Sequence, residues 1–427
     1  MTMINQSHSS ERSLDEWLSY LENLHRTEID LGLKRISMVA KRLHIDFSFA
    51  KVITVAGTNG KGTTCAFLEN SLLAENYSVA VYSSPHIELF NERLRINKVD
   101  VEDSPLIQAF KKIELAREDI SLTYYEYTTL AAFLVLMTEQ PDVILLEVGL
   151  GGRLDATNLI DADVAVISSI DLDHQAFLGD TREKIGFEKA GIMRANRIAV
   201  VGDPNPPLSV IEHATSIKAK LITRGVDFYV EQANVNNEAI TSWQWKNNEC
   251  VLKHLKKPHI PLDNIATGLS VLHALEIELT SDKVNTVIEQ TKVAGRTELF
   301  ILANGTHVML DVGHNPHATR YLASLLKGKG YNNIHAVVSM LQDKDITNSL
   351  LPLTDIVKQW YVGELSVPRA ESANNIAKHL PKNSGKVNCF DNVTDAYKMA
   401  TNNAEATDLV LVFGSFFTVS EIRRLHL

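Results

Sequence analysis

The chain has 427 residues, more than a single hydrophobic core usually organises, so its length predicts two domains. Hydrophobic residues make up 45% of the sequence and charged residues 22%, which is typical of a globular protein and excludes a long disordered or fibrous chain. The 42 Lys and Arg against 52 Asp and Glu give a net charge of −10. This charge disfavours nucleic acid or an anionic membrane as a partner.

The cysteines, the apolar runs and the N-terminus indicate the cellular compartment of the protein. Cys65, Cys250 and Cys389 are too few and too far apart for a disulfide framework or a cysteine metal site. The longest clean apolar run, Leu130–Met137, is far shorter than the roughly 20 residues of a membrane span. The N-terminus lacks the basic and apolar stretches of an export signal. We therefore expect a cytoplasmic protein.

The N-terminal part predicts helices followed by alternating strands and helices. Ser13–Glu16 has the pattern of a capping box, and a second helix is expected from about 31 to 43. The alternation that follows is typical of a parallel sheet covered by helices on both faces. Its predicted strands are Val52–Ala56, Val79–Tyr82, Val143–Val148, Val164–Ile167 and Ile198–Val201, and its predicted helices include Thr64–Asn76, Thr128–Glu139 and Glu183–Met193.

The pattern changes after about Gly225. Residues 225–261 predict a small antiparallel β section, and two helices follow at Asn264–Glu276 and Asp282–Thr291. We expect an α/β protein with an N-terminal P-loop ATPase domain (residues 1–295), whose parallel sheet is flanked by helices and accompanied by the antiparallel section. A smaller, Rossmann-like α/β domain (residues 296–427) is expected to contain the strands Val308–Leu310, Ala336–Ser339, Trp360–Val362 and Leu409–Phe413.

Gly57–Thr64, with the sequence Gly-Thr-Asn-Gly-Lys-Gly-Thr-Thr, follows a predicted strand and opens a predicted helix. Glycines in this position let backbone N–H groups converge on phosphate oxygens at the positive end of a helix. Lys61 can neutralise the β and γ phosphates, and the Thr63 hydroxyl can hold Mg²⁺. The match to the usual phosphate loop is imperfect, because Val55 replaces the first glycine and Gly62 separates the lysine from the threonine. A glycine turn without a ligand is the alternative interpretation.

A carboxylate for the metal is predicted at Glu147, which ends an apolar strand at the place of a Walker-B acid. The glycine-rich turn after it, with Arg153 and Asp155, suits close approach of a ligand to the backbone. Asp171–His174 follows another strand end at the same edge of the sheet, where ligands bind to parallel sheets. An ordinary strand-terminal glutamate and a structural histidine are the competing interpretations.

Six segments of this chain occur together in one order. They are the phosphate loop, Ser83–His86, Glu147–Asn158, Asp173–His174, Glu188–Gly191 and Asp311–Pro316. In this order the chain resembles the folylpolyglutamate synthase/dihydrofolate synthase family of Mur-ligase-like ATP-dependent amide ligases, over nearly its whole length.

The resemblance implies an enzyme that ligates L-glutamate to dihydropteroate, forming dihydrofolate, and to the glutamate tail of tetrahydrofolates, through an acyl phosphate. It implies ATP as co-substrate, two Mg²⁺ ions and a monomer whose partners are small-molecule substrates: dihydropteroate, reduced folates, L-glutamate and ATP.

The resemblance also implies roles for single residues. Lys61, Lys189 and His174 are implied as catalytic, and Lys189 matches a lysine that this family carbamylates with CO₂. An exposed helical lysine is the alternative interpretation of Lys189, and histidine is a less usual ligand than oxygen for a hard cation. His314 and Asn315 are implied on the glutamate side, between the domains. The implied ATP contacts are Thr58, Asn59, Gly60, Lys61, Gly62, Thr63, Asn264, Arg296 and Asp311, and the implied metal ligands are Thr63, Ser84, Glu147 and His174.

A separate dihydropteroate pocket distinguishes the bifunctional members of the family. Glu28 stands where a small polar residue is usual, and core packing is the alternative role of Tyr124 and Tyr125. The resemblance places the pocket at Glu28-Ile29-Asp30, Thr123-Tyr124-Tyr125-Glu126 and Leu154-Asp155-Ala156.

Three alternative functions remain open at this point. A monofunctional folylpolyglutamate synthase would use the same ATP site without the dihydropteroate pocket. Another Mur-type ligase is disfavoured, because only about fifty residues precede the phosphate loop, too few for a UDP-binding domain. A nucleotide-dependent regulatory protein would have no use for Glu147, His174 and Lys189 together.

Overall fold

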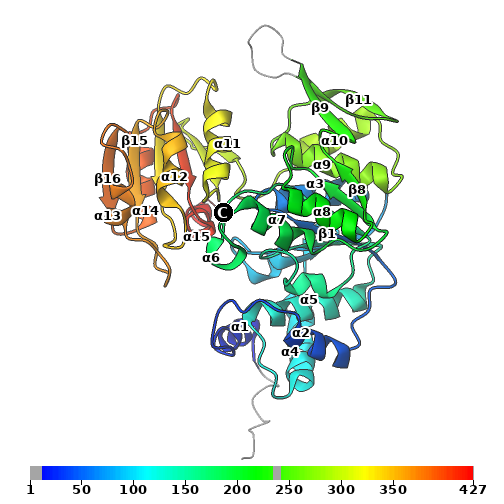
Figure 1. The fold of residues 1–427 in the computed structure, drawn as a ribbon. Coiled ribbons are helices and arrows are strands. Elements are labelled where there is room, and N and C mark those ends of the chain that lie inside the picture. The colour runs from blue at the N-terminus through cyan, green and yellow to red at the C-terminus, as the bar shows by residue number, and fades with distance from the viewer. Residues whose placement is uncertain (1–11, 234–241, 427) are drawn as a thin grey trace, which may run out of the picture.

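The structure is a computed structural model that describes residues 12–233 and 242–426. Three sheets with their helices make up this part of the chain (Figure 1). The largest sheet has the strand order β4-β3-β2-β5-β1-β6-β7-β8. The strands β1, β2, β5, β6, β7 and β8 are parallel to one another, and β3 and β4 form an antiparallel edge. Its strands are β1 (Lys51–Ala56), β2 (Val79–Tyr82), β3 (Leu94–Ile96), β4 (Val99–Asp100), β5 (Val143–Glu147), β6 (Val164–Ile167), β7 (Ile198–Val201) and β8 (Lys220–Thr223).

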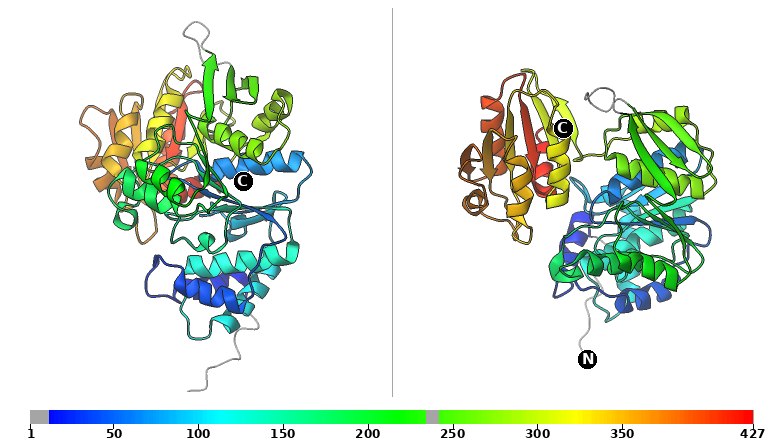
Figure 2. Two further views of the ribbon diagram at one scale, coloured as in Figure 1. Left: turned by 45° about the vertical axis from the view of Figure 1, so that its right-hand side comes forward. Right: turned by 45° about the horizontal axis from the view of Figure 1, so that its top comes forward.

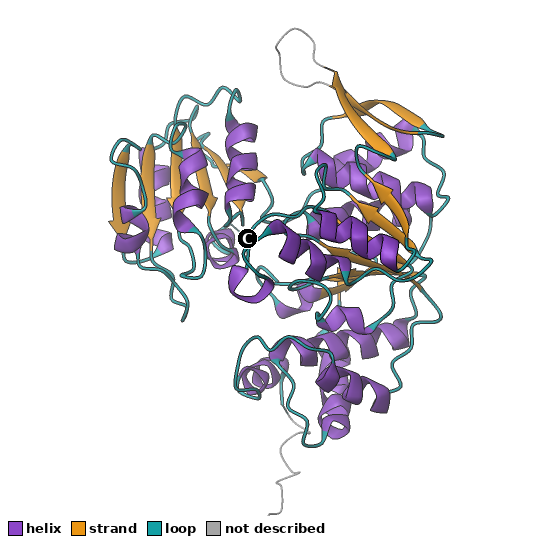
Figure 3. Cartoon of the chain, viewed as in Figure 1, coloured by secondary structure: helices purple, strands orange, loops and turns teal. Residues whose placement is uncertain are grey.

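Helices cover both faces of this sheet (Figure 3). Side chains alternate between the faces along each strand, so a strand buried on both sides is apolar throughout, as β5 is. One face carries α1 (Leu14–Glu22), α2 (Lys34–Arg42), α4 (Asp103–Arg117), α5 (Tyr124–Glu139), α6 (Gln175–Leu178), α7 (Arg182–Ala190) and α8 (Leu208–Ser216). The other face carries α3 (Lys61–Ala74), α9 (Leu262–Ala274) and α10 (Ser281–Gln290).

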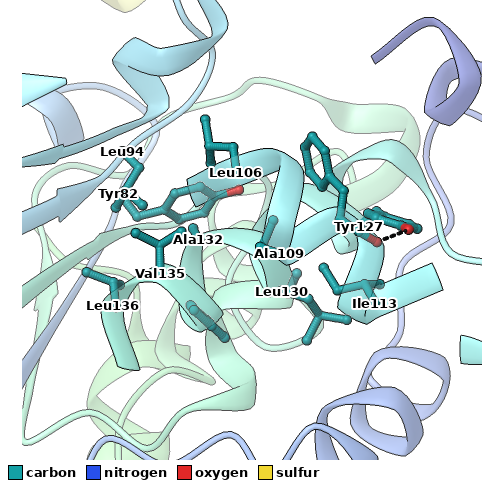
Figure 4. Packing of buried hydrophobic residues seen from close by; sticks show 14 of the residues in the cluster. Tyr82, Leu94, Leu106, Ala109, Ile113, Tyr127, Leu130, Ala132, Val135 and Leu136 are labelled. Carbon is teal, nitrogen blue, oxygen red and sulfur yellow. Dashed lines mark hydrogen bonds between the residues drawn. The ribbon is translucent and has the colours of Figure 1, made fainter. Parts of the chain in front are cut away.

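The helices α1, α2, α4 and α5 form a core with β2, β3 and β5. Figure 4 shows Tyr82 and Leu94 from the sheet packed against Leu106, Ala132 and other residues of α4 and α5. The predicted capping box is confirmed at α1, where the Ser13 and Glu16 side chains each accept the other's backbone N–H.

The predicted antiparallel section is confirmed as a sheet of β9 (Phe228–Ala233), β10 (Ser242–Asn247) and β11 (Val251–Lys256), with β10 in the middle. Trp243 and Trp245 on β10 are fully buried against the core that α3, α9 and α10 share. This small sheet therefore stabilises the helix that follows the phosphate loop.

The C-terminal part forms a separate six-stranded sheet beside the rest of the chain (Figure 2, right). Its order is β12-β13-β17-β14-β15-β16, and only β12 is antiparallel to its neighbour. The strands are β12 (Glu298–Ile301), β13 (His307–Asp311), β14 (Ile334–Val338), β15 (Gln359–Gly363), β16 (Lys386–Phe390) and β17 (Leu409–Phe413). The helices α11 (Pro316–Leu326), α12 (Ile346–Leu350) and α13 (Ala373–Lys378) cover one face, and α14 (Val393–Asn403) and α15 (Phe416–Arg423) the other.

The fold class predicted from the sequence is confirmed by these sheets. The predicted domain boundary near Gly295 lies in the connection between α10 and β12, and the division at this residue stays a prediction. No helix within the described residues is long and apolar enough to cross a membrane.

Candidate active site

The predicted site residues lie at the carboxyl ends of the central parallel strands. β1, β2, β5 and β6 are neighbours, and each is followed by a predicted site segment. These segments are the phosphate loop after β1, Ser84 after β2, Glu147 at the end of β5 and His174 beyond β6. Parallel strands bring their carboxyl ends to one edge of a sheet, which is where ligands bind in such folds.

The phosphate loop is closely packed against α9. Gly60 has a φ of 87°, and a Cβ atom on it would lie 2.4 Å from Asn264 Oδ1, so only glycine fits there. Asn264 Nδ2 donates to Thr63 Oγ1 at 2.7 Å, and this hydroxyl donates to Gly60 O at 3.0 Å. Lys61 Nζ donates to Gly57 O at 3.0 Å. The structure thus brings together the loop and Asn264, and their role as ATP contacts stays a prediction.

Gly62, the departure from the usual phosphate loop, faces Glu147. A Cβ atom on Gly62 would lie 3.4 Å from Glu147 Oε2. The Glu147 carboxylate is buried, and burial raises its pKa against the lowering effect of Lys61 and then of Arg296. Gly62 therefore lies in direct contact with the acid that the sequence predicts beside the loop.

Arg296 lies close to Glu147 of the N-terminal part and to Asp311 of the C-terminal part. Burial lowers the pKa of its guanidinium, which the charges of Asp311 and Glu147 counteract. The same guanidinium lies over the Phe416 ring, 4.9 Å from the ring centroid. Asp311 is also buried and accepts hydrogen bonds from the Thr297 and Gly313 backbones, at 2.8 and 2.7 Å. The predicted ATP contacts of the C-terminal part thus lie beside the predicted metal acid.

Asp173 is the centre of a second contact between the two parts. Its carboxylate accepts from Lys344 Nζ and Asn315 Nδ2, both at 3.0 Å, and lies 3.6 Å from His314 Nε2. Burial raises the pKa of Asp173, but the neighbouring His314 and the charge of Lys344 hold it well below its usual range. His314 and Asn315 therefore lie in the contact between the two parts of the chain, and their place on the glutamate side stays a prediction.

His174 lies in the same contact. Its Nε2 atom is 3.5 Å from Lys344 Nζ, and its backbone has a left-handed φ of 50°. Burial and then the charge of Lys344 lower its pKa to about 4, so the imidazole is neutral at neutral pH. A neutral imidazole is the form that binds metals.

The phosphate loop also reaches the C-terminal part directly. Asn59 and Asn315 exchange two side-chain hydrogen bonds of 3.1 Å, and Asn59 Nδ2 lies 3.0 Å from His317 Nδ1. Thr58 Oγ1 donates to Asp171 O at 2.9 Å. The N-terminal loop and the start of α11 are therefore in contact across the site.

Lys189 is buried at the end of α7, with 3% of its surface exposed. This excludes the exposed helical lysine that was the alternative interpretation. No carboxylate in the described part of the chain forms an ion pair with it, and burial, followed by the charge of Lys61, lowers its pKa to about 7. The turn at Gly152 packs against it, because a Cβ atom there would lie 3.1 Å from Lys189 Cα and 2.8 Å from Glu188 O.

Two of the predicted dihydropteroate segments meet at Tyr125. Its hydroxyl accepts from Gly149 N at 3.0 Å and donates to Asp155 Oδ1 at 3.4 Å. Asp155 is buried and caps the short helix η2 (Ala156–Leu159), since Oδ1 accepts from Thr157 N and Oγ1 at 2.9 and 2.7 Å. Oδ2 accepts from Leu150 N at 2.9 Å. Leu154 and Ala156 flank this aspartate, and Ala156 is buried in the core.

The third segment joins the Thr123–Glu126 segment through Arg35. This guanidinium donates to Asp30 Oδ2 at 2.6 Å and to Glu126 Oε1 at 3.1 Å. Glu126 also forms a capping box with Thr123, so these two residues fix the start of α5. Ile29 is half-buried between Asp30 and Glu28, and the latter pairs with Arg369 of the C-terminal part at 3.2 Å.

Tyr124, in the Thr123–Glu126 segment, contacts Arg93 and Phe90. Its ring lies under the Arg93 guanidinium at 5.3 Å and meets Phe90 edge to face. The three predicted dihydropteroate segments are therefore brought together on one side of the sheet edge.

The donors at this edge suit a hard cation. Thr63 and Ser84 can supply hydroxyl oxygens, and Glu147 supplies a buried carboxylate. Within residues 12–233 and 242–426, no three His, Cys, Asp or Glu side chains alone form a group that could hold a metal. A cation here would depend on these hydroxyls and on the ligand phosphates. His174 as a further ligand stays a prediction.

Comparison with known proteins settles the family. A family model described as Mur ligase middle domain matches residues 55–255, and one described as Mur ligase, glutamate ligase domain matches residues 295–416. The dihydrofolate synthase/folylpolyglutamate synthase of Escherichia coli K12 is 43% identical over 423 residues, which cover 98% of this chain and 97% of that protein. The chain belongs to this family of Mur ligases.

Solved structures of the family have the same fold. FolC of Escherichia coli in complex with DHPP and ADP superimposes with a TM-score of 0.91 at 43% identity, covering 98% of both chains. A bifunctional folylpolyglutamate synthase/dihydrofolate synthase with Mn, AMPPNP and L-glutamate bound superimposes with a TM-score of 0.89 at 42% identity, covering 98% of this chain and 99% of that one. The predictions of family, fold class and ATP-dependent glutamate ligation are thereby confirmed.

Two functional candidates were missed by the sequence reasoning. Lys344 lies in a charged turn after β14, and its side chain is only 7% exposed. Arg35 lies on α2 and links two pocket segments. A charged loop beyond the carboxyl end of a parallel strand was the available signal for Lys344. Nothing in the local sequence distinguishes Arg35 from an ordinary surface arginine.

Proposed function

We propose that this chain ligates L-glutamate to dihydropteroate, forming dihydrofolate, and to the glutamate tail of tetrahydrofolates, in both cases at the expense of ATP. We place ATP between residues 1–295 and 296–427, with Lys61 and Asn264 on one side and Arg296 and Asp311 on the other. The observation that supports this best is the convergence of the phosphate loop, the buried Glu147 and the acceptor segments on one edge of the sheet.

The chemistry requires an activated carboxylate, because an amine cannot displace oxide from a carboxylate. The acceptor carboxylate oxygen forms a bond to the γ-phosphorus of ATP, and ADP leaves with the electrons of the broken P–O bond. The glutamate amine then attacks the acyl carbon, loses a proton, and inorganic phosphate leaves. Phosphoryl transfer between anions depends mainly on positioning and on neutralising charge. Lys61, whose Nζ atom lies at the loop carbonyl Gly57 O, supplies a cation there.

Two Mg²⁺ ions would complete the neutralisation, one held by Thr63 and one by Ser84, Glu147 and His174. When bound, they would stabilise the negative charge that develops on the transferring phosphoryl group. Oxygen donors and a neutral imidazole are available in this chain for that role.

We assign Lys189 as the site of a carbamate formed with CO₂. A carbamate forms from the uncharged amine, and the low pKa of Lys189 makes that form available near neutral pH. The product is an anion beside Lys61, whose charge counts against a protonated Lys189 and would favour a negative group.

A phosphate-release assay tests the function. Dihydropteroate, 7,8-dihydrofolate and tetrahydrofolate would each be supplied with ATP, with and without L-glutamate. Glutamate-dependent phosphate release is expected with dihydropteroate and with tetrahydrofolate. Release with tetrahydrofolate but not with dihydropteroate would refute the first activity and leave a monofunctional folylpolyglutamate synthase.

A further inference from the structure

Arg93 lies between the segment that follows β2 and the predicted acceptor segment at the start of α5. Its backbone carbonyl accepts a hydrogen bond from Ser83 N at 2.9 Å. Its guanidinium lies over the Tyr124 ring, 5.3 Å from the ring centroid, and over the Phe90 ring, at 5.6 Å. These two rings meet edge to face, with their centroids 6.3 Å apart. The aromatic pair therefore holds this cation beside the predicted acceptor segments.

One nitrogen of this guanidinium is fixed by a hydrogen bond, and the other two are not. Arg93 Nε donates to His86 Nδ1 at 3.0 Å. Burial and then the charge of Arg93 lower the pKa of His86 to about 4, so the imidazole is neutral and this ring nitrogen can accept. Within the described residues, no hydrogen bond or ion pair uses the two terminal nitrogens of Arg93. The side chain is only half-buried, so these nitrogens can reach a ligand.

The acids near Arg93 in the sheet and in the sequence are occupied elsewhere. Glu92 accepts hydrogen bonds from three backbone N–H groups of residues 87–89, each at 2.8 Å. Glu69, which is buried, pairs with Arg95 at 2.8 Å. Arg93 therefore keeps its positive charge without a carboxylate partner in the part of the chain that the structure describes.

Other arginines around the acceptor segments differ in this respect. Arg35 pairs with Asp30 and Glu126, at 2.6 and 3.1 Å, and Arg153 pairs with Glu188 at 2.9 Å. Their charges are already balanced by the protein itself. A substrate anion that binds beside the acceptor segments would therefore meet an uncompensated arginine at Arg93.

A guanidinium in this state suits a carboxylate. Guanidinium and carboxylate groups can form two parallel charge-assisted hydrogen bonds, and the planar shape of arginine fixes their geometry. The rings and the bond to His86 hold the guanidinium of Arg93 in place, so less conformational freedom is lost when an anion binds. Dihydropteroate and the glutamate tail of tetrahydrofolate each bring such a carboxylate to the site.

We propose that Arg93 binds the reacting carboxylate of the acceptor, and that Phe90, Tyr124 and His86 hold Arg93 in position for this role. The inference rests on the proposed function and deepens it, because it names the residue that recognises the acceptor carboxylate. Such an ion pair would also neutralise one of the two anions that meet in phosphoryl transfer. L-Glutamate carries carboxylates too, so the experiment must separate the acceptor from glutamate.

Acceptor binding can be measured without turnover. Isothermal titration calorimetry would follow 7,8-dihydropteroate added to the full chain saturated with ADP and Mg²⁺, without L-glutamate. Arg93→Met removes the charge and keeps a long side chain over the rings, and we expect its dissociation constant to rise about 10- to 100-fold. Arg12→Met is the matched control, because Arg12 also lies over two rings, 4.9 Å from Trp17 and 4.2 Å from Tyr20. It should bind dihydropteroate like the wild type.

The methyl ester of dihydropteroate tests whether the charge of the ligand is what Arg93 recognises. The wild type should bind the ester more weakly than the acid, whereas Arg93→Met should bind the two alike. Arg93→Lys keeps a cation without the planar fork and should bind the acid with intermediate affinity. Should Arg93→Met fail to fold, the wild type still decides the matter, since equal binding of ester and acid would overturn the role.

Failure of this inference can be told apart from failure of the proposed function. A wild type that does not bind dihydropteroate would refute the proposed acceptor and the role of Arg93 with it. A wild type that binds dihydropteroate, with an unchanged dissociation constant in folded Arg93→Met, would refute the role of Arg93 alone. In the phosphate-release assay, the KM for L-glutamate should stay unchanged in Arg93→Met. A raised KM for L-glutamate with unchanged dihydropteroate binding would assign Arg93 to glutamate and overturn the inference.

Discussion

Lys189 offers the sharpest test of the site, because its environment sets the fraction of uncharged amine. A pKa of about 7 leaves about half of the side chains uncharged at pH 7, whereas the ordinary lysine value of 10.5 leaves about one in 3000. Burial is the main cause of this shift, and the charge of Lys61 adds to it. The uncharged amine is the nucleophile that attacks CO₂, so this shift raises its availability about 1500-fold.

Carbamylation of Lys189 should therefore depend on pH. As the pH rises through 7, the amine loses its proton and carbamylation becomes easier. As it falls below 7, the amine is protonated and the carbamate is lost. In CO₂-depleted buffer we expect activity to fall and to return when bicarbonate is added, with a larger effect at pH 6 than at pH 8. Native mass measurement should show an added mass of one CO₂ under the same conditions.

Lys189→Ala should be inactive and partly rescued by acetate or formate, which can replace the missing carboxylate. Lys184→Ala is the matched control, because Lys184 lies on the same helix, exposed, and pairs only with Asp180 in the described part of the chain. It should keep wild-type activity and CO₂ dependence. Wild-type activity of Lys189→Ala, or CO₂-independent activity of the wild type without added mass, would refute the reasoning.

Three further predictions concern the shared machinery. Lys61→Ala should stay folded, as judged by circular dichroism, and lose about 10²-fold or more in kcat, because it removes a cation at the transferring phosphoryl group; near-normal kcat in the folded variant would contradict its assignment. Lys344→Met should lower the free energy of unfolding in urea by about 1.5–3 kcal/mol, since the buried Asp173 carboxylate loses a charged donor, while the exposed Lys398→Met changes it little. Asp155→Ala should reduce kcat/KM for dihydropteroate more than for tetrahydrofolate, whereas Glu147→Ala and His174→Ala should reduce both.

The central sheet could be predicted from the sequence because its strands are buried on both faces. β5 is apolar and buried along its whole length, so the run of residues alone identifies it. The edge strands β4 and β16 could not be identified in this way, because β4 has two exposed residues and β16 alternates irregularly. Short, half-exposed strands depend on the neighbour they pair with and carry little periodicity of their own.

The site was predictable where motifs sit directly at strand ends, as at Lys61 and Glu147. Contacts between distant segments were not predictable. Lys344 and Asp173 are 171 residues apart, and Arg35 and Glu126 are 91 apart, so their pairing depends on how helices and sheets pack. A lysine in a surface-like turn becomes a buried partner only once the C-terminal sheet approaches.

Asp155 illustrates how the structure sharpens a prediction made from sequence. A carboxylate in this pocket can accept hydrogen bonds from the N–H groups of a pterin ring. The structure gives Oδ1 three donors, from Thr157 and Tyr125, and gives Oδ2 one, from Leu150. A carboxylate oxygen has two lone-pair positions, so Oδ2 alone retains capacity for a ligand.

Asp155 therefore has two separable functions, one in the turn and one toward the acceptor. Loss of the bond to the acceptor is expected to cost roughly 1–3 kcal/mol, or about 5- to 150-fold in kcat/KM for dihydropteroate. Loss of the turn would disturb Leu150 and Tyr125, which contact the segment that follows Glu147, and would affect both acceptors. Thr157→Val removes one Oδ1 donor and leaves Oδ2 untouched, so it reports the turn alone. A selective loss of dihydropteroate activity in Asp155→Ala but not in Thr157→Val would assign Oδ2 to the acceptor, and equal losses on both acceptors in Asp155→Ala would assign the aspartate to the turn.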